Sequence, residues 1–302
     1  MQIIKYKKFY ILFSLLLLVP GIISLAVFKL NLSIDFTGGS VFKYEIKTQD
    51  QNNKNIEDTL RVIFKNKDIV VESITYDQDN IIVLRTKPVV SQKNDEIKTE
   101  LAAKLNYLSQ VSFETVGPSV GKEAARKAFL SIIIASLGIL LYIAYAFRNI
   151  PKPYSSFRFG VSAIIAMLHD AFVVLGVFSL LGHFLKVEID ALFITAILTV
   201  IGFSVHDTIV VFDRIRENLN KLPKGYKFSD IVNYSVVETL NRSMATSLTV
   251  ITTLLSLFIL GGSSIRYFVL ALLIGITSGT YSSIFTAAPI LVYWEELKLR
   301  KK

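Results

Sequence analysis

The segment AILTVIGFSVHDTIVVFDRIREN, residues 196–218, places a histidine and an aspartate inside a run that is otherwise apolar enough to cross a lipid bilayer. An ionised carboxylate at the centre of a membrane-spanning helix costs several kcal/mol, about 2.5–3.5 kcal/mol on translocon-insertion scales. Ionisable side chains at that depth are therefore candidates for ion or proton pathways. Asp207 is accordingly the first candidate functional residue, and His206 stands beside it.

The composition places the whole chain in the membrane class. It has 302 residues, of which 52% are hydrophobic, and a mean hydropathy of +0.51. The formal charge is +9, but the basic residues stand in short segments between apolar blocks. No basic stripe interleaved with aromatic residues is present, which argues against nucleic-acid binding. The chain has no cysteine, so disulfides, thiolate metal sites and cysteine nucleophiles are excluded.

Six apolar blocks reach the roughly 20 residues that a helix needs to span the hydrocarbon core. They cover residues 9–28, 128–147, 158–181, 190–212, 242–261 and 267–292. The first block follows three lysines and lacks a small-x-small cleavage site before Lys29, so we expect a retained anchor helix rather than a signal peptide. The sequence thus predicts an α-helical polytopic membrane protein with six transmembrane helices.

Basic residues flank these blocks before the first, between the second and third, after the fourth and after the sixth. All four clusters fall on the cytoplasmic side if both termini are cytoplasmic, as the positive-inside rule requires. The clusters are Lys5, Lys7 and Lys8; Arg148, Lys152 and Arg158; Arg214, Arg216, Lys221, Lys224 and Lys227; and Lys298, Arg300, Lys301 and Lys302. Both termini are therefore predicted to be cytoplasmic.

The polar residues 29–125 then form a domain outside the membrane, between residues 1–28 and a five-helix bundle over 126–302. Residue alternation and helical spacing predict a β-α-β-β-α-β order, which is the ferredoxin-like pattern. The strands are expected at 41–46, 69–76, 81–85 and 111–116, the helices at 55–66 and 96–108, and a turn at 77–80. This small α+β domain contains no catalytic constellation, so we expect it to act as a contact or clamp domain.

Four of the spans carry small or polar residues on one helical face, and lipid is a poor neighbour for such faces. The face of the fifth span holds Arg242, Thr246, Thr249, Thr253 and Ser256, and that of the fourth holds Thr195, Thr199, Gly202 and His206. The face of the third holds Ser162, Ala166, His169 and Gly176, with Asp170 beside them, and that of the sixth holds Gly275, Gly279, Ser282 and Thr286. We expect all four to pack inward, and Asp207 to meet Arg242 in the cytoplasmic half of the bundle. Protonation of Asp207 would then release Arg242, which makes the pair a two-state element.

Each of these features also has a plainer interpretation. Asp207 and Arg242 could form a static ion pair, and His206 could only support Asp207. His169 and Asp170 could be an interhelical hydrogen-bond site without a relay role. The hydroxyl-bearing face of the fifth span could serve packing alone.

Several motifs resemble the SecF family of the bacterial SecD–SecF protein-export complex, in the resistance-nodulation-division superfamily. IDFTGGS (34–40) resembles the Asp-Phe-x-Gly-Gly motif of this family, and the segment 196–218 is the most specific match. Further similar segments are GPSVGKE (117–123), MLHDAFVVLGVFSL (167–180) and ETLNRSMATSLTV (238–250). The resemblance places Asp35, Phe36, Gly38 and Gly39 in the family motif, Asp207 on the essential aspartate and Arg242 on the arginine of the fifth helix. His206 stands where the family often has asparagine.

The resemblance implies a subunit of the bacterial plasma (inner) membrane that, with SecD, couples the proton-motive force or a sodium gradient to late steps of Sec-dependent translocation. It implies SecD, the SecY-E-G translocon, YajC and translocating preproteins as partners. It implies no enzymatic activity, cofactor or metal. Asp207, Arg242 and His206 would form the relay, and His169 and Asp170 are secondary candidates.

Two other functions remain open. A related permease module of the same superfamily would carry lipids or small molecules, although such permeases usually hold two modules in a longer chain. An intramembrane enzyme could use the His-Asp pairs 169–170 and 206–207 as metal ligands. Adjacent residues on a helix diverge by about 100°, so each pair would offer one ligand, and no HExxH motif is present.

Overall fold

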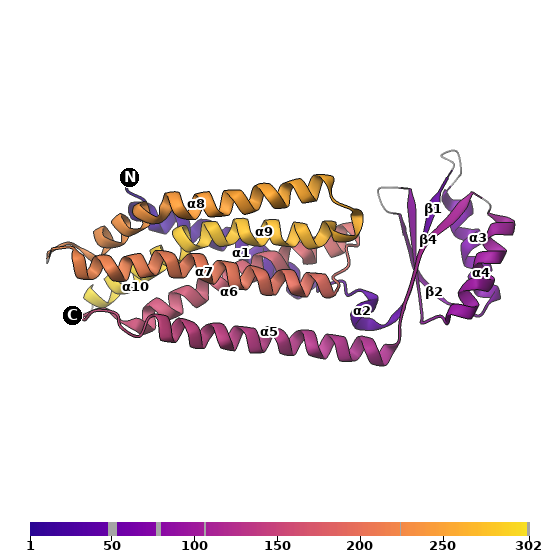
Figure 1. Cartoon of the computed structure of the whole chain (residues 1–302), viewed down its shortest axis with the longest axis horizontal. Coiled ribbons are helices and arrows are strands. Elements are labelled where there is room, and N and C mark those ends of the chain that lie inside the picture. The colour runs from indigo at the N-terminus through magenta and orange to yellow at the C-terminus, as the bar shows by residue number, and fades with distance from the viewer. Residues whose placement is uncertain (48–52, 77–79, 106, 224, 301–302) are drawn as a thin grey trace. The chain divides into compact units, whose positions relative to one another are not determined.

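The computed structural model describes residues 1–302 except 48–52, 77–79, 106, 224 and 301–302. The chain folds into two compact units. One unit combines residues 1–31 with residues 130–302 and is built from long helices (Figure 1). The other comprises residues 32–129 and contains a sheet and shorter helices.

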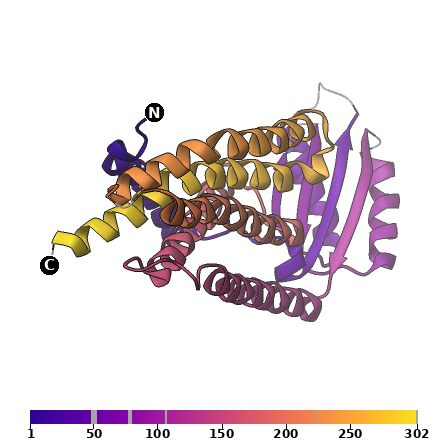
Figure 2. The same ribbon diagram turned by 60° about the vertical axis from the view of Figure 1, so that its left-hand side comes forward.

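Within the described residues, the long helices provide six segments whose length and apolar composition suffice to cross a membrane, which confirms the six predicted spans. These are α1 (Lys7–Phe28), which follows η1 (Ile4–Tyr6); α5 (Pro118–Ala146); α6 (Ser156–Leu185); α7 (Ala191–Lys221); α8 (Phe228–Leu260); and a composite last span. The last span joins η2 (Ser263–Ile265), α9 (Arg266–Ser282), a π-helical turn η3 (Ser283–Ala287) and α10 (Ala288–Arg300). The start of the chain and the end of α10 lie at the same end of this bundle (Figures 1 and 2).

Among the described residues, α6, α7 and the last span are the most buried of the six spans. The start of α7 follows from its local sequence. The Asp190 side chain accepts a hydrogen bond from the Phe193 backbone N–H (2.9 Å) and so caps the first turn of α7. Helix α1 packs directly on α6 through glycine, because a Cβ atom on Gly176 would lie only 2.3 Å from the Gly21 Cα. The small residues that were predicted to face inward on α6 are indeed buried: Ser162, Ala166, His169 and Gly176.

The second unit has the element order that the residue pattern predicted. After α2 (Ile34–Thr37), the chain forms β1 (Gly39–Ile46), α3 (Asn53–Asn66), β2 (Val71–Tyr76), β3 (Ile81–Thr86), α4 (Ser91–Lys104) and β4 (Leu108–Val116). The sheet order is β2-β3-β1-β4, and each neighbouring pair is antiparallel. Helices α3 and α4 cover one face of this sheet (Figure 2). In the register, Phe42 lies opposite Leu84 and Phe113, which places it at the centre of the core.

The predicted helix at 96–108 is wrong at both ends. Helix α4 begins earlier, at Ser91, and ends at Lys104. Leu108 continues the apolar spacing but starts β4, because its strand pairs with the end of β1 and places Leu108 opposite Ile46. Most of the predicted turn at 77–80 lies outside the described residues, as do the predicted cytoplasmic lysines Lys224, Lys301 and Lys302.

Candidate functional site

Asp207 lies inside the helical unit, with its side chain turned toward α8 and the last span. Asp207 is 6% exposed. Ser243 of α8 donates to both carboxylate oxygens, at 2.7 Å from Oδ1 and 2.6 Å from Oδ2. Ser283 of η3 donates to Oδ2 at 2.9 Å. The carboxylate is thus held by neutral hydroxyl donors from two helices.

The expected contact between Asp207 and Arg242 is not made, so that prediction is wrong for this chain. Among the described residues, no ion pair joins the two side chains, and Arg242 is exposed. The reason is helical geometry, because consecutive residues point about 100° apart. Ser243 takes the inward position on α8, and Arg242 therefore points away from Asp207.

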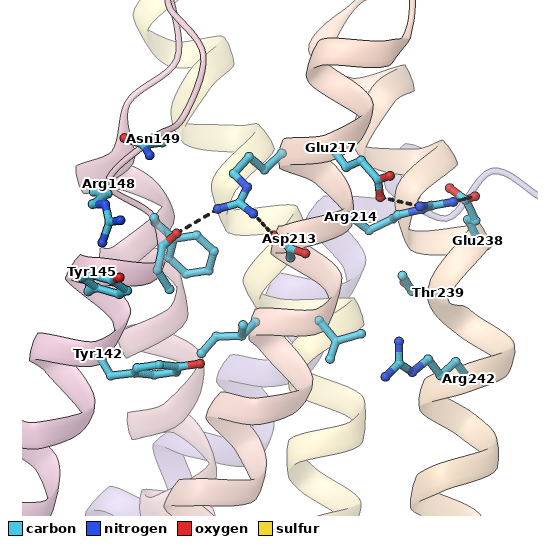
Figure 3. A pocket seen from close by; sticks show the side chains of 15 residues that line it. Tyr142, Tyr145, Arg148, Asn149, Asp213, Arg214, Glu217, Glu238, Thr239 and Arg242 are labelled. Atoms are coloured by element: carbon cyan, nitrogen blue, oxygen red, sulfur yellow. Dashed lines mark hydrogen bonds and ion pairs between the residues drawn. The ribbon is translucent and has the colours of Figure 1, made fainter.

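Arg242 instead lines a cavity of about 650 Å³ between α5, α7 and α8 (Figure 3). Figure 3 shows it reaching from α8 into the space beside α7. The other arginines of this cavity have partners: Arg214 pairs with Glu217 and Glu238, Arg216 pairs with Asp213 (2.5 Å), and Arg148 stacks on the Tyr145 ring (3.7 Å to its centroid). In the described part of the chain, Arg242 is the arginine of this cavity for which no charged partner or aromatic ring is found.

Two of the four predicted inward faces are not covered by this chain. Thr195, Thr199, Gly202 and His206 of α7 are exposed, and so are Arg242, Thr246, Thr249, Thr253 and Ser256 of α8. The α8 hydroxyls satisfy themselves on their own helix; Thr246, for example, donates to the Arg242 carbonyl at 2.9 Å. His206 therefore lies on a different face of α7 from Asp207 and does not contact the carboxylate. The other two faces, on α6 and the last span, are buried as predicted.

Asp170 of α6 forms a second buried carboxylate site, and it is 0% exposed. Three hydroxyls donate to it: Ser204 of α7 (2.5 Å) and Ser282 of α9 (2.6 Å) to Oδ2, and Ser278 of α9 (2.7 Å) to Oδ1. The His169 Nδ1 lies 3.0 Å from Oδ1. The Nε2 atom of the same ring is buried and has no hydrogen-bond partner among the described residues.

Sequence reasoning identified both acids but missed most of the hydroxyls that hold them. Ser204, Ser243, Ser278 and Ser283 were not singled out as ligands, and Ser282 was assigned only to a packing face. Spacing along one helix could not identify Ser204 as a donor, because its acceptor Asp170 lies on a different helix, α6. The π-helical turn η3, which brings Ser283 to Asp207, has no sequence signal either.

The Asp-Phe-x-Gly-Gly residues belong to the sheet unit and form a sharp turn there. Asp35 and Phe36 lie in α2, and the chain then enters β1 through Gly38 (φ 74°) and Gly39 (φ 135°), backbone conformations that favour glycine. A Cβ atom on Gly121 would lie 2.7 Å from the Gly38 nitrogen, so the two glycine motifs touch backbone to backbone. This turn is a structural element of the sheet unit.

Comparisons with known proteins agree over nearly the entire chain. Residues 96–297 match the family described as "Protein export membrane protein SecD/SecF, C-terminal", and residues 23–50 match the "SecD/SecF GG Motif". The protein translocase subunit SecF of Thermobaculum terrenum is 45% identical over 97% of this chain and 94% of its own length. The protein translocase subunit SecDF of Bacillus subtilis is 38% identical over 98% of this chain, which corresponds to 38% of that longer protein.

A solved structure shows the same fold. The crystal structure of SecDF from Thermus thermophilus, titled as a translocon-associated membrane protein, superposes with a TM-score of 0.81 at 32% identity. The match covers 98% of this chain and 39% of that one. These relatives support a role in protein translocation for a multi-pass membrane protein. With two family matches and full-length relatives at this identity, the chain belongs to the SecD/SecF family of protein-export membrane proteins.

Proposed function

We propose that this chain is the SecF half of a SecD–SecF pair that uses the proton-motive force, or a sodium gradient, to assist late steps of Sec-dependent protein translocation. The observation that carries the proposal is the state of Asp207. It is buried in α7, which is long and apolar enough to cross a membrane, and in the described part of the chain its carboxylate accepts side-chain hydrogen bonds only from neutral hydroxyls. A buried charge without a countercharge is costly, so uptake of a proton or a cation from the gradient would relieve it.

The uncovered faces of α7 and α8 support a SecD-like partner. They carry hydroxyls, His206 and Arg242 at positions that would otherwise face lipid. Lipid-exposed ionisable groups are rare in spanning helices, which usually turn them toward protein or water. The SecDF relatives, in which this chain matches little more than a third of the length, support the same pairing. Arg242, which points into the cavity beside this face, would then meet its counterion on the partner.

Orientation and the role of the sheet unit follow from the same proposal. We place both termini and the basic clusters in the bacterial cytoplasm, in line with the positive-inside rule. The sheet unit then lies outside the inner membrane as a ferredoxin-like contact or clamp domain for emerging preproteins. Its split β-α-β order and the strand order β2-β3-β1-β4 support the ferredoxin-like assignment. The SecY-E-G translocon and YajC are the proposed further partners.

We propose no catalytic activity and no cofactor for this chain. The two His-Asp pairs are separated, since His169 is buried on α6 whereas His206 is exposed on α7. Metal analysis of the purified complex tests the alternative of a metal-dependent enzyme. Transport assays with lipids and small molecules test the alternative of a permease module.

Asp207→Asn tests the proposal directly. The amide keeps the size of the side chain but cannot exchange a proton, so we expect the variant to insert, to co-purify with its SecD-like partner and to lose gradient-dependent secretion of a reporter preprotein. Asp213→Asn is the matched control, because Asp213 lies nearly two turns farther along α7 and pairs with Arg216 at the cavity surface. Secretion at the unaltered level in Asp207→Asn cells would refute the relay.

A further inference from the structure

Two consecutive serines at the end of α9 connect the two buried carboxylates. Ser282 donates to Asp170 Oδ2 at 2.6 Å, and Ser283 donates to Asp207 Oδ2 at 2.9 Å. Both serines are fully buried. Ser283 is also the first residue of the π-helical turn η3, and such turns are rare and frequently occur at functional sites.

Each of the two serines has a second acceptor on its own helix. The Ser282 hydroxyl lies 3.3 Å from the Gly279 carbonyl oxygen, and the Ser283 hydroxyl lies 3.2 Å from the Thr280 carbonyl oxygen. A serine hydroxyl carries one proton but can accept through its lone pairs. Each serine can therefore donate either to a carboxylate on a neighbouring helix or to a carbonyl of its own helix.

Protonation of Asp207 changes which of these bonds Ser283 can make. While the carboxylate is ionised, Ser283 donates to it. When Oδ2 takes up a proton, its new O–H becomes a donor, and Ser283 Oγ accepts it while turning its own proton to the Thr280 carbonyl. No bond within the serine breaks, and the added proton comes from the gradient. The hydrogen bond between this turn and α7 then has Asp207 as its donor and Ser283 as its acceptor.

We propose that Ser282 and Ser283 transmit the protonation state of Asp207 to Asp170, which makes Asp170 a second, proton-linked site in the membrane unit. This inference rests on the proposed function, since it requires Asp207 to gain and lose a proton. The two serines share one helical turn, so a reorientation of Ser283 against Asp207 alters the hydrogen bond of Ser282 to Asp170. Both are positioning residues, because they act through the two acids.

The surroundings of the two acids limit which other groups could respond. From α6 itself, His169 contacts Asp170. On α7, the titratable neighbour of Asp207 is His206, which is exposed on another face of the helix. From α8, Arg242 is exposed beside Ser243. From the last span and α1, Tyr281 donates to the Tyr10 carbonyl rather than to either carboxylate. His169 is thus the one titratable side chain, among those described, that contacts Asp170.

Infrared difference spectroscopy tests this coupling on the full chain with its SecD-like partner, reconstituted in phospholipid with isotope-labelled aspartate. The pH is stepped, and the bands of Asp207 and Asp170 are assigned by their loss in Asp207→Asn and Asp170→Asn. In the unaltered complex we expect protonation of Asp207 to shift the Asp170 band. We expect that shift to be lost in Ser282→Ala and in Ser283→Ala.

Ser278→Ala is the matched control. It removes a hydroxyl donor from the same Asp170 carboxylate, at 2.7 Å, but Ser278 does not neighbour a ligand of Asp207. We expect the Asp207-dependent shift to remain in this variant. Should Ser283→Ala fail to assemble, Ser283→Cys takes its place with the same expectation, because a thiol has similar size but is a weak donor.

The outcomes separate this inference from the proposed function. If no Asp207 band titrates in the unaltered complex, the proposed proton relay fails and the coupling fails with it. If Asp207 titrates but the Asp170 band does not respond, or responds equally in Ser282→Ala, Ser283→Ala and Ser278→Ala, the serine coupling is overturned and the relay stands.

Discussion

Ser243 donates its hydroxyl to both oxygens of the Asp207 carboxylate, at 2.7 Å and 2.6 Å, from the position directly beside Arg242. Ser243, which binds the acid, and Arg242 are consecutive residues of α8 and therefore point about 100° apart. Ser243 faces the buried Asp207, and Arg242 faces the cavity between α5, α7 and α8 (Figure 3). Within this chain the acid and the cation belong to two different environments.

Replacement of Ser243 by alanine should therefore destabilise the helical unit. Of the side-chain donors that the described residues supply, Asp207 would keep Ser283, and a hydrogen bond to a charged group contributes about 1.5–3 kcal/mol. We expect a loss of about that size in the free energy of unfolding, measured in detergent through the fluorescence of Trp294, the single tryptophan. Ser247→Ala is the control. Ser247 is buried on the same face of α8 but has no hydrogen-bond partner among the described residues, so its loss should be nearly neutral. Equal effects of the two substitutions would contradict the role given to Ser243.

Arg242→Ala, in contrast to Ser243→Ala, should impair activity without reducing the stability of the chain. In this chain the side chain is exposed and makes no ion pair that the described residues reveal, so the stability of the solubilised chain should change by less than about 0.5 kcal/mol. Gradient-dependent secretion should nevertheless fall at least about tenfold, or about 1.4 kcal/mol, because the proposed counterion lies on the partner. Arg242→Lys should recover part of the activity, since lysine keeps the charge but loses the planar fork.

Arg148→Ala provides the comparison for that experiment. It removes a cation from the opposite wall of the same cavity, where Arg148 stacks on Tyr145. Secretion should stay close to the unaltered level. A similar loss in both variants would show that the cavity responds to total charge and not to the position of Arg242.

The different directions of Ser243 and Arg242 also show which parts of the site could be predicted from the sequence alone. Apolar runs predicted the six spans and the burial of Asp207 and Asp170, because an apolar helix of about 20 residues has few other places to go. The inward direction of a helix face is harder to predict, since a shift of one residue turns it by about 100°. On α7 and α8, polar residues occur on more than one face. Among the described residues, the polar side chains that this chain buries include Ser204 and Asp207 of α7 and Ser243 and Ser247 of α8. The π-helical turn depends on tertiary packing and leaves no periodic signal in the sequence.

The contact between α1 and α6 provides a prediction about packing. A Cβ atom at residue 176 would lie 2.3 Å from the Gly21 Cα and 2.9 Å from its carbonyl carbon, so Gly176→Ala must push the helices apart. Overpacking of this kind typically costs about 1–3 kcal/mol. We expect a lower thermal midpoint in detergent, again followed through Trp294. Gly138→Ala in α5 is the control, because a Cβ there meets no atom within 4 Å. An unchanged midpoint in Gly176→Ala would mean that α1 does not pack on α6 in this way.

The sheet unit offers a prediction about pH through Tyr44. Its phenol is 1% exposed, and its hydroxyl has no hydrogen-bond partner among the described residues. Burial raises the pKa of Tyr44 above its ordinary value, because the charged phenolate would lose its hydration. A raised pKa in the folded state means that the unfolded state releases its proton first as the pH rises. The phenol therefore leaves the stability independent of pH below the unfolded pKa of about 10, and above it the free energy of unfolding falls by about 1.4 kcal/mol per pH unit.

Tyr44→Phe isolates that contribution, since it keeps the ring in the core and removes only the hydroxyl. Below about pH 9 we expect the variant to be as stable as the unaltered chain or slightly more stable, because no hydrogen bond is lost and a buried unpaired hydroxyl is removed. Above about pH 10 the difference should grow in favour of the Tyr44→Phe variant. Pulse proteolysis of the sheet unit in urea, on the full chain at several pH values, measures both. The lysines titrate in the same range, but they are common to the two chains, so only their difference reports on Tyr44. A difference that stays constant through the alkaline range would show that the phenol ionises as readily in the folded state as in the unfolded one, and so is not sealed in the core between β1 and the two helices.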